Sequence, residues 1–224
     1  MGRLPQKQGH KGSQKWLQRL VNDSPRIINL QLQQRLKIPT SDNIIWLSPL
    51  VNDEYAEYRD NSFLDRLNIR LPKKQLKDFW PRGGPVWDGL AKSDSGKIFL
   101  VEAKAHIPEA VSSGTGAGPE SLKLIRQSLA ETKKYLRSKS PDDWSSTFYQ
   151  YTNRLAHLYL LRVLNDIPVY LVFIYFLNDQ EMNGPSSISK WHGAIELLHA
   201  YLGIRENRLS DYTINVFVDV REIR

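Results

Sequence analysis

The stretch VWDGLAKSDSGKIFLVEAKAH (residues 86–106) decides the fold. Its second half, KIFLVEAKAH (97–106), has four consecutive apolar residues after the lysine, so both alternating rows of side chains start apolar. This pattern predicts a central strand that is covered on both faces. Residues 86–92 predict a preceding strand, and SDSG (93–96) is typical of the tight turn of a hairpin between the two.

Helices and further strands are predicted on both sides of this hairpin. Helices are predicted at 13–21 (with Ser13 as a candidate cap), 27–37, 53–67, 122–136, 148–164 and 187–202. Strands are predicted at 168–177 and 212–220, whereas 43–50 suits either a short strand or a buried turn. This order indicates an α/β sandwich around a mixed sheet. We expect a basic helical N-terminal arm (1–42) followed by one domain (43–224).

The composition is that of a soluble globular protein. The chain has 224 residues, of which 41% are hydrophobic and 25% charged, and it contains no cysteine. Disulfides and thiolate zinc sites are thereby excluded, and a reducing cytoplasm is the expected compartment. The N-terminus lacks the apolar core of a secretion signal, and the longest apolar run (167–177) is too short for a membrane helix. We therefore expect no membrane partner.

Basic residues are concentrated at the N-terminus. Residues 1–40 contain eight basic residues and one acid, while the rest of the chain is balanced. Such a segment favours a polyanionic partner, the alternative being a solubilising tail. A second basic run, RLPKKQLKDFWPR (70–82), either flanks a groove or is a solvated loop. The candidate nucleic-acid-binding residues are Lys11, Lys15, Arg19, Lys73, Lys74, Lys77 and Arg82.

Charged residues end the central strand. Glu102, Lys104 and His106 continue the row of side chains begun by Ile98, so they share one face of the sheet. Burying such charges costs several kcal/mol each unless they are paired or bound to metal. A Glu102–Lys104 ion pair alone would satisfy both groups. However, hairpin pairing can bring Asp88 beside Glu102, and two adjacent carboxylates favour a divalent cation such as Mg²⁺ or Mn²⁺.

This arrangement resembles the PD-(D/E)xK nuclease superfamily, which includes restriction endonucleases and Holliday-junction resolvases. The matching residues are Asp88 and the run Glu102 to Lys104, although Trp87 stands where a proline is usual. The resemblance implies a restriction endonuclease-like three-layer sandwich with an αβββαβ core. It also implies Mg²⁺-dependent phosphodiester hydrolysis, with metal held by Asp88, Glu102 and the carbonyl of Ala103. Lys104 would orient or activate the attacking water.

Many relatives in this superfamily add an acid from the first core helix. In EYRDNSFLDRL (57–67), Glu57 precedes an aromatic–leucine pair at the usual distance, so it is the candidate fourth member of the site and a further metal ligand. Glu54 is the second choice, being nearly one helical turn away. The alternative for Glu57 is an ordinary solvated residue on the surface of a helix.

Other polar residues are weaker candidates. His106 either touches a phosphate or is a polar residue at the margin of the sheet. Gln127, on the helix after the glycine-rich loop 112–121, is either a site glutamine or solvated. The loop itself lacks the Gly-Lys-Ser/Thr ending of a phosphate loop. The segment YQYTNR (149–154) can stack on bases or bind phosphate, or it is the exposed start of a helix.

The leading hypothesis is a metal-dependent nuclease that acts on DNA, with RNA not excluded and a homodimer possible, since many such nucleases dimerise to cut two strands. The second hypothesis is a non-catalytic nucleic-acid-binding or assembly module on the same fold. A third is an enzyme on another α/β fold, in which Glu102 and Lys104 form only an ion pair and Asp88 lies far from Glu102.

Overall fold

A five-stranded mixed sheet forms the middle layer of the protein. The structure is a computed structural model, and it describes residues 2–224. In spatial order the strands are β2 (Ile44–Ser48), β4 (Gly89–Ser93), β5 (Ile98–Lys104), β6 (Val169–Leu177) and β7 (Thr213–Asp219). The first three strands are antiparallel neighbours, whereas β5, β6 and β7 run parallel to one another.

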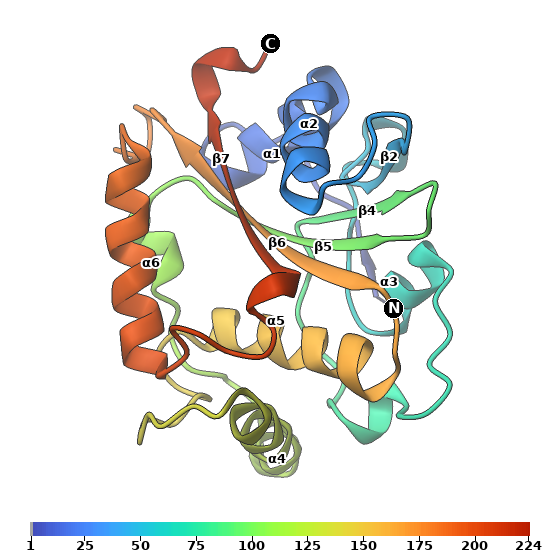
Figure 1. Cartoon of the computed structure of the whole chain (residues 1–224), viewed down its shortest axis with the longest axis vertical. Helices are drawn as coiled ribbons and strands as arrows, with labels where there is room; N and C mark the ends of the chain where they lie inside the picture. Colours follow the sequence, from blue (N-terminus) through green and yellow to red (C-terminus); the bar gives the residue numbers. More distant parts are fainter. Residues whose placement is uncertain (1) are drawn as a thin grey trace.

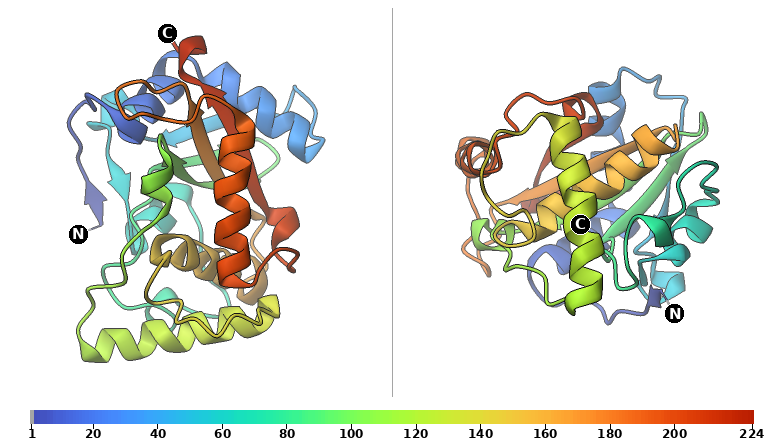
Figure 2. Two further views of the ribbon diagram at one scale, coloured as in Figure 1. Left: turned by 90° about the vertical axis from the view of Figure 1, so that its left-hand side faces the viewer. Right: turned by 90° about the horizontal axis from the view of Figure 1, so that it is seen from below.

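Helices cover both faces of this sheet, so the protein is an α/β sandwich (Figure 1). On one face lie α1 (Gly12–Asp23) and α2 (Pro25–Leu36). On the other lie α4 (Pro119–Leu136), α5 (Tyr149–Tyr159, continued by a π-helical turn at Leu160–Leu164) and α6 (Ile188–Leu202). Helix α4 crosses α5 on the side away from the sheet (Figure 2). The short helix α3 (Asn61–Leu67) and the ribbon of β1 (Arg3–Leu4) with β3 (Glu57–Tyr58) complete the fold.

The predicted hairpin and its buried second strand are confirmed. Residues 98–103 of β5 are all buried, with Leu100 in the core beneath α5 and Phe99 in the core beneath α1 and α2. The strands pair as Gly89 with Val101 and Leu90 with Leu100. The turn closes with the amide of Ser93 donating to the carbonyl of Lys97, and Gly96 takes the left-handed φ of +85° that favours glycine.

The basic N-terminal segment forms one helical layer of the sandwich. Leu20, Ile28 and Leu32 have no exposed surface and pack in the same core as Phe99 of the central strand. The amphipathic pattern of these helices therefore explains their position better than their charge does, because each turns an apolar stripe to the sheet. The exposed basic residues of this segment include Lys11, Arg26 and Arg35.

The predicted helix at 53–67 is wrong in its first half. The chain makes a 3-10 turn at Val51–Asp53, then takes left-handed φ angles at Glu54 and Tyr55 and enters strand β3. The α-helix begins only at Asn61. Long-range pairing is the physical reason, because Glu57 pairs with Leu4 in β1 and a strand partner overrides a weak local helical preference.

The ends of the first helix also differ from expectation. Helix α1 begins at Gly12 rather than after Ser13, and no side chain caps it. The hydroxyl of Ser13 instead donates to Oε1 of Glu109 at 3.4 Å. Of the two alternatives for 43–50, the structure has the strand, β2. The strands at 168–177 and 212–220 and the helices of the second half are present within a few residues of their predicted bounds. Within residues 2–224, none of the helices combines the length and apolarity needed to cross a bilayer.

Helix α2 offers a direct test of this layer. Leu32→Ala should lower the free energy of unfolding by about 2–5 kcal/mol, because Leu32 is fully buried against the sheet. Leu30→Ala is the matched control on the same helix; Leu30 is 36% exposed, so the change should stay within about 0.5 kcal/mol. Urea unfolding followed by circular dichroism measures both. Equal small losses would show that α2 is not packed on the sheet.

Candidate active site

The hairpin brings the two predicted acids together. Asp88 directly precedes β4, and since Gly89 pairs with Val101, it lies beside Glu102. Its Oδ2 accepts a hydrogen bond from the amide of Ala103 at 2.8 Å. Asp88, Glu102 and Lys104 line one open pocket of about 440 Å³ at the C-terminal end of β5. The third hypothesis required these acids to be far apart, and this geometry removes its premise.

Glu102 is buried between two cations. It is only 3% exposed; its Oε1 accepts from Nζ of Lys104 at 2.6 Å and its Oε2 accepts from Nε of Arg154 at 2.7 Å. Burial alone would raise the pKa of Glu102, but Arg154 and Lys104 hold that pKa below its usual range. Conversely, burial tends to lower the pKa of Lys104, yet the charges of Glu102 and Asp88 raise it above its usual value. Glu102 and Lys104 are therefore both charged at neutral pH.

Asp88 and Glu57 have strongly raised pKa values. Burial, followed by the negative charge of Glu102, raises the pKa of Asp88 to about 7, although Lys104, Arg154 and the amide of Ala103 partly oppose this. Burial raises the pKa of Glu57 to about 8, with Asp88 and Glu102 adding to the shift. Carboxyl groups are therefore crowded at this end of the sheet, where burial favours the neutral forms of Asp88 and Glu57, and a bound cation would favour their charged forms.

Glu57 reaches the site from strand β3, not from the predicted helix. Its Oε2 accepts from Nε2 of Gln6 at 3.0 Å, and Gln14 donates in turn to Oε1 of Gln6 at 3.3 Å. Glu57 also shares a small pocket of about 40 Å³ with Asp88 and Ser13. The N-terminal segment thus covers the Glu57 side of the site. Glu54, the second choice, is exposed and forms an ion pair with Arg3 at 3.5 Å.

The donor set suits a hard cation only in part. Within residues 2–224, no three His, Cys, Asp or Glu side chains are close enough to form a ready metal cluster. The carboxylates of Asp88 and Glu102, with the carbonyl of Ala103 between them in sequence, are oxygen donors of the kind Mg²⁺ and Mn²⁺ prefer. Both oxygens of Glu102 are also bonded to cations. A metal held here would therefore share Glu102 and keep several waters, as Mg²⁺ commonly does.

Arg154 and Gln150 on α5 complete the site, and the sequence did not identify Arg154 as a partner of Glu102 or Gln150 as a partner of Lys104. Besides Glu102, Arg154 binds the carbonyl of Val86 at 2.7 Å through Nη2, and its guanidinium lies 4.9 Å from the ring centre of Trp87. Gln150 Oε1 accepts from Nζ of Lys104 at 3.0 Å. The available signal was a polar stripe at helical spacing (Gln150, Arg154, His157) on a helix whose other residues are nearly all buried.

The weaker polar candidates, His106 and Gln127, lie in different surroundings. His106 Nδ1 lies 3.4 Å from Oε1 of Glu109, whose Oε2 accepts from the amide of Ala105 at 2.6 Å. Glu109 lines the pocket of Asp88 and was missed by the sequence reasoning. Gln127 is exposed on α4, and the glutamine that contacts Lys104 comes from α5 instead.

The predicted basic residues lie in separate places. Lys73 and Lys74 both donate backbone amides to Asn165, beyond the end of α5 that is remote from Gln150, and Lys73 also pairs with Asp166. Lys77 is exposed on a short 3-10 turn nearby. Of the predicted residues in 70–82, only Arg82 lines a groove that adjoins the site. Segment 70–82 is therefore not one continuous wall of the site.

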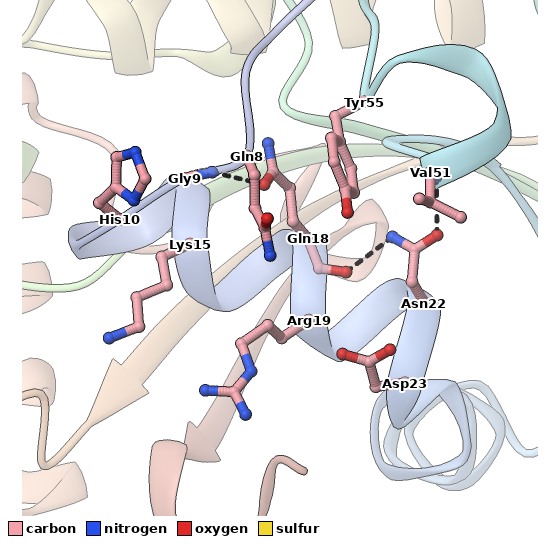
Figure 3. A pocket seen from close by; sticks show the side chains of 10 residues that line it. All are labelled: Gln8, Gly9, His10, Lys15, Gln18, Arg19, Asn22, Asp23, Val51 and Tyr55. Atoms are coloured by element: carbon pink, nitrogen blue, oxygen red, sulfur yellow. Dashed lines mark hydrogen bonds between the residues drawn. The ribbon is translucent and has the colours of Figure 1, made fainter.

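The N-terminal basic residues surround a different hollow. Lys15 and Arg19 line a depression of about 610 Å³ beside α1 (Figure 3). Lys15 donates to Glu181 at 2.7 Å, and both basic side chains lie over the ring of Trp16, at 4.6 and 5.6 Å from its centre. Lys11 is exposed at the residue before α1. Lys15 therefore already has a carboxylate partner within the chain.

Removing one cation from Glu102 should be costly. Arg154→Met should lower the free energy of unfolding by about 3–5 kcal/mol, because a buried ion pair is broken and a charge is left underpaired. In a Glu102→Gln background the same change should cost much less, which a double-mutant cycle by urea unfolding measures. Arg126→Met breaks the exposed pair with Asp143 and should cost less than about 1 kcal/mol. Additive costs for Arg154 and Glu102 would contradict the pairing.

His157 should make stability depend on pH. The ring is 1% exposed, and Nδ1 donates to the carbonyl of Asn153 at 2.8 Å. Burial, helped by the charge of Arg154, lowers the pKa of His157 to about 4, although Asp60 opposes the shift. The folded state thus binds this proton less readily than the unfolded state. The resulting stability is present above the unfolded pKa of about 6.5 and is lost as the pH falls towards 4.

The comparison of wild type with His157→Asn isolates this effect, since other acidic groups titrate in both proteins. The stability advantage of wild type should shrink by up to about 1.4 kcal/mol per pH unit between pH 6.5 and 4. Urea unfolding at several pH values measures it. A constant difference across this range would show that His157 is not buried in the neutral form.

No family model, curated protein or solved structure matches this chain. The chemistry of the site is therefore inferred from its own geometry. Asp88 and Glu102 line one pocket with Lys104, whose ammonium donates to Glu102 and Gln150. The buried Arg154 donates to the other carboxylate oxygen of Glu102.

Proposed function

We propose that this protein is a metal-dependent nuclease of the PD-(D/E)xK type that hydrolyses phosphodiester bonds in DNA. One observation carries the proposal: Asp88 is bonded to the amide of Ala103 and lies beside Glu102, in the pocket that also holds Lys104. These are the residue types, in the relative positions, that the resemblance requires. A substrate of RNA and a homodimeric state remain predictions.

The strand order supports a restriction endonuclease-like fold. An αβββαβ core needs helix, three antiparallel strands, helix and then a strand parallel to the third. Helices α1 and α2 precede β2, β4 and β5, after which α4 and α5 lead to β6, which is parallel to β5. On this assignment α1 stands where the superfamily often supplies an acid. The only acidic residue of helix α1 is Asp23, at its C-terminal end, so Glu57 of β3 would take that role.

The chain's own residues would each act on a phosphodiester in a distinct way. A Mg²⁺ or Mn²⁺ ion held by Asp88, Glu102 and the carbonyl of Ala103 would supply Lewis-acid and water-activating chemistry. Lys104, 13% exposed, holds its ammonium at the pocket, where it can stabilise the negative charge that the phosphate gains in the transition state. Arg154 would act as a positioning residue, because its guanidinium is paired with Glu102 through Nε and Nη2.

A second candidate function is a non-catalytic nucleic-acid-binding or assembly module. The specific observation in its favour is that Glu102 has a cation on each carboxylate oxygen, so it is satisfied without a metal. This candidate leaves the raised pKa values of Asp88 and Glu57 without a role. The two candidates differ in one measurable property, which is metal-dependent cleavage.

Cleavage assays decide between them. Plasmid, linear and branched DNA are incubated with and without Mn²⁺ or Mg²⁺. Wild type should cut only with metal, and Lys104→Ala or Asp88→Asn should reduce the rate by about 10²–10³-fold, as loss of a transition-state contact does. Lys190→Ala, an exposed lysine on α6, is the control and should cut like wild type.

Thermal unfolding must show that the variants are folded before their rates are compared. If folded Lys104→Ala cuts as fast as wild type, or if cleavage needs no metal, the proposed active site is wrong. If wild type binds DNA and never cuts it, the non-catalytic module is the better account.

A further inference from the structure

A second groove adjoins the candidate active site. It has a volume of about 560 Å³, and its walls are the loop 81–86 and the glycine-rich loop 112–117. The first turns of α5 line it as well, through Tyr149, Gln150 and Arg154. Gln150 and Arg154 line both this groove and the pocket of Asp88, so the two cavities adjoin at these residues.

The charges in this groove have one sign. Among the described residues that line it, the charged side chains are Arg59, Arg82 and Arg154, and there is no carboxylate. Arg154 is neutralised by Glu102, whereas Arg82 is exposed and Nε of Arg59 is buried without a hydrogen-bond partner. The groove therefore presents Arg82, which is exposed, and Arg59, whose side chain is 35% exposed and lies in a long ion pair with Asp60.

Asp60 fixes this positive wall without lining it. Its two oxygens accept from the amides of Gly83 and Gly84 at 3.2 and 2.9 Å, which holds the loop that carries Arg82. Nε of Arg59 is 3.9 Å from the same carboxylate, too far for a hydrogen bond. The carboxylate therefore holds the loop beside Arg59 and makes no hydrogen bond to Nε of that arginine.

The shape of the groove favours one strand over two. A cavity of about 560 Å³ has the size of a site for a drug-sized molecule, so it accommodates one nucleotide unit of a strand. The opposite side of the site is covered, since Gln6 binds Glu57 and Ser13 binds Glu109. Tyr149, half-buried in the groove, offers a ring for base stacking, which binds single strands with little sequence preference.

We propose that this groove binds a single strand of nucleic acid and leads it to the site of Asp88, Glu102 and Lys104. Arg59 and Arg82 contact phosphates beside the reacting one, and Tyr149 contacts a base. The proposal deepens the proposed function and rests on it for the direction of the strand, but binding in the groove is measurable without any cleavage.

The test is fluorescence anisotropy of a labelled oligothymidine in EDTA, over a range of salt concentrations. Arg59→Ala and Arg82→Ala should each weaken binding several-fold, and each should reduce the slope of log Kd against log salt by about 0.7, the value for one lost phosphate contact on a single strand. Tyr149→Ala should weaken binding with no change in slope. Arg205→Ala, an exposed arginine outside the groove, is the matched control and should bind like wild type.

Two further arms define the ligand. Oligouridine that binds with the same dependence on Arg59 and Arg82 supports the same strand chemistry and adds RNA as a source. A duplex of equal length that binds as tightly, with the same dependence on these arginines, overturns the single-strand assignment. So does unchanged binding by both arginine variants, provided that circular dichroism shows them folded.

These results separate the groove from the nuclease. If the arginine variants bind normally while wild type still cuts DNA with metal, the groove is wrong and the proposed function stands. If they lose binding while wild type never cuts, the groove stands and the proposed nuclease activity is wrong.

Discussion

The buried carboxylate of Glu102 is the constraint on which the site depends. A carboxylate at the end of a central strand is costly to bury, so it must be matched by cations that the fold supplies locally. Lys104 comes from the same strand, two residues on, whereas Arg154 comes from α5. Arg154 also binds the carbonyl of Val86, just before the segment that carries Asp88. Through Arg154, Glu102 thus links the central strand to α5 and to the segment that leads into β4.

This arrangement also explains why Asp88 differs from Glu102. The two cations lie on Glu102, and the amide of Ala103 is the hydrogen-bond donor to Asp88. The pKa of Glu102 is therefore lowered and the pKa of Asp88 is raised, although both are buried in the same region. Two carboxyl groups with opposite shifts are typical of sites that do chemistry, because each group is suited to a different role.

The sequence predicted what depends on local patterns and missed what depends on distant partners. The hairpin and the position of Asp88 beside Glu102 follow from alternation, burial and turn residues within 86–106. The strand conformation at Glu57 could not be predicted in this way, because its partner Leu4 is far away in the chain. Arg154 is likewise separated from Glu102 by 52 residues, and only the packing of α5 on the sheet brings them together.

The N-terminal segment shows how charge and burial give different information. Its excess of basic residues suggested an arm that reaches for a polyanion, yet Leu20, Ile28 and Leu32 belong to one layer of the core. Because that layer lies over the sheet, residues before and within α1 come to rest on the site itself, through Gln6 on Glu57 and Ser13 on Glu109. The side of the site next to α5 is left open and is lined by arginines. On the proposed function, an anionic substrate would therefore approach from the side of α5, because the N-terminal segment covers the other side.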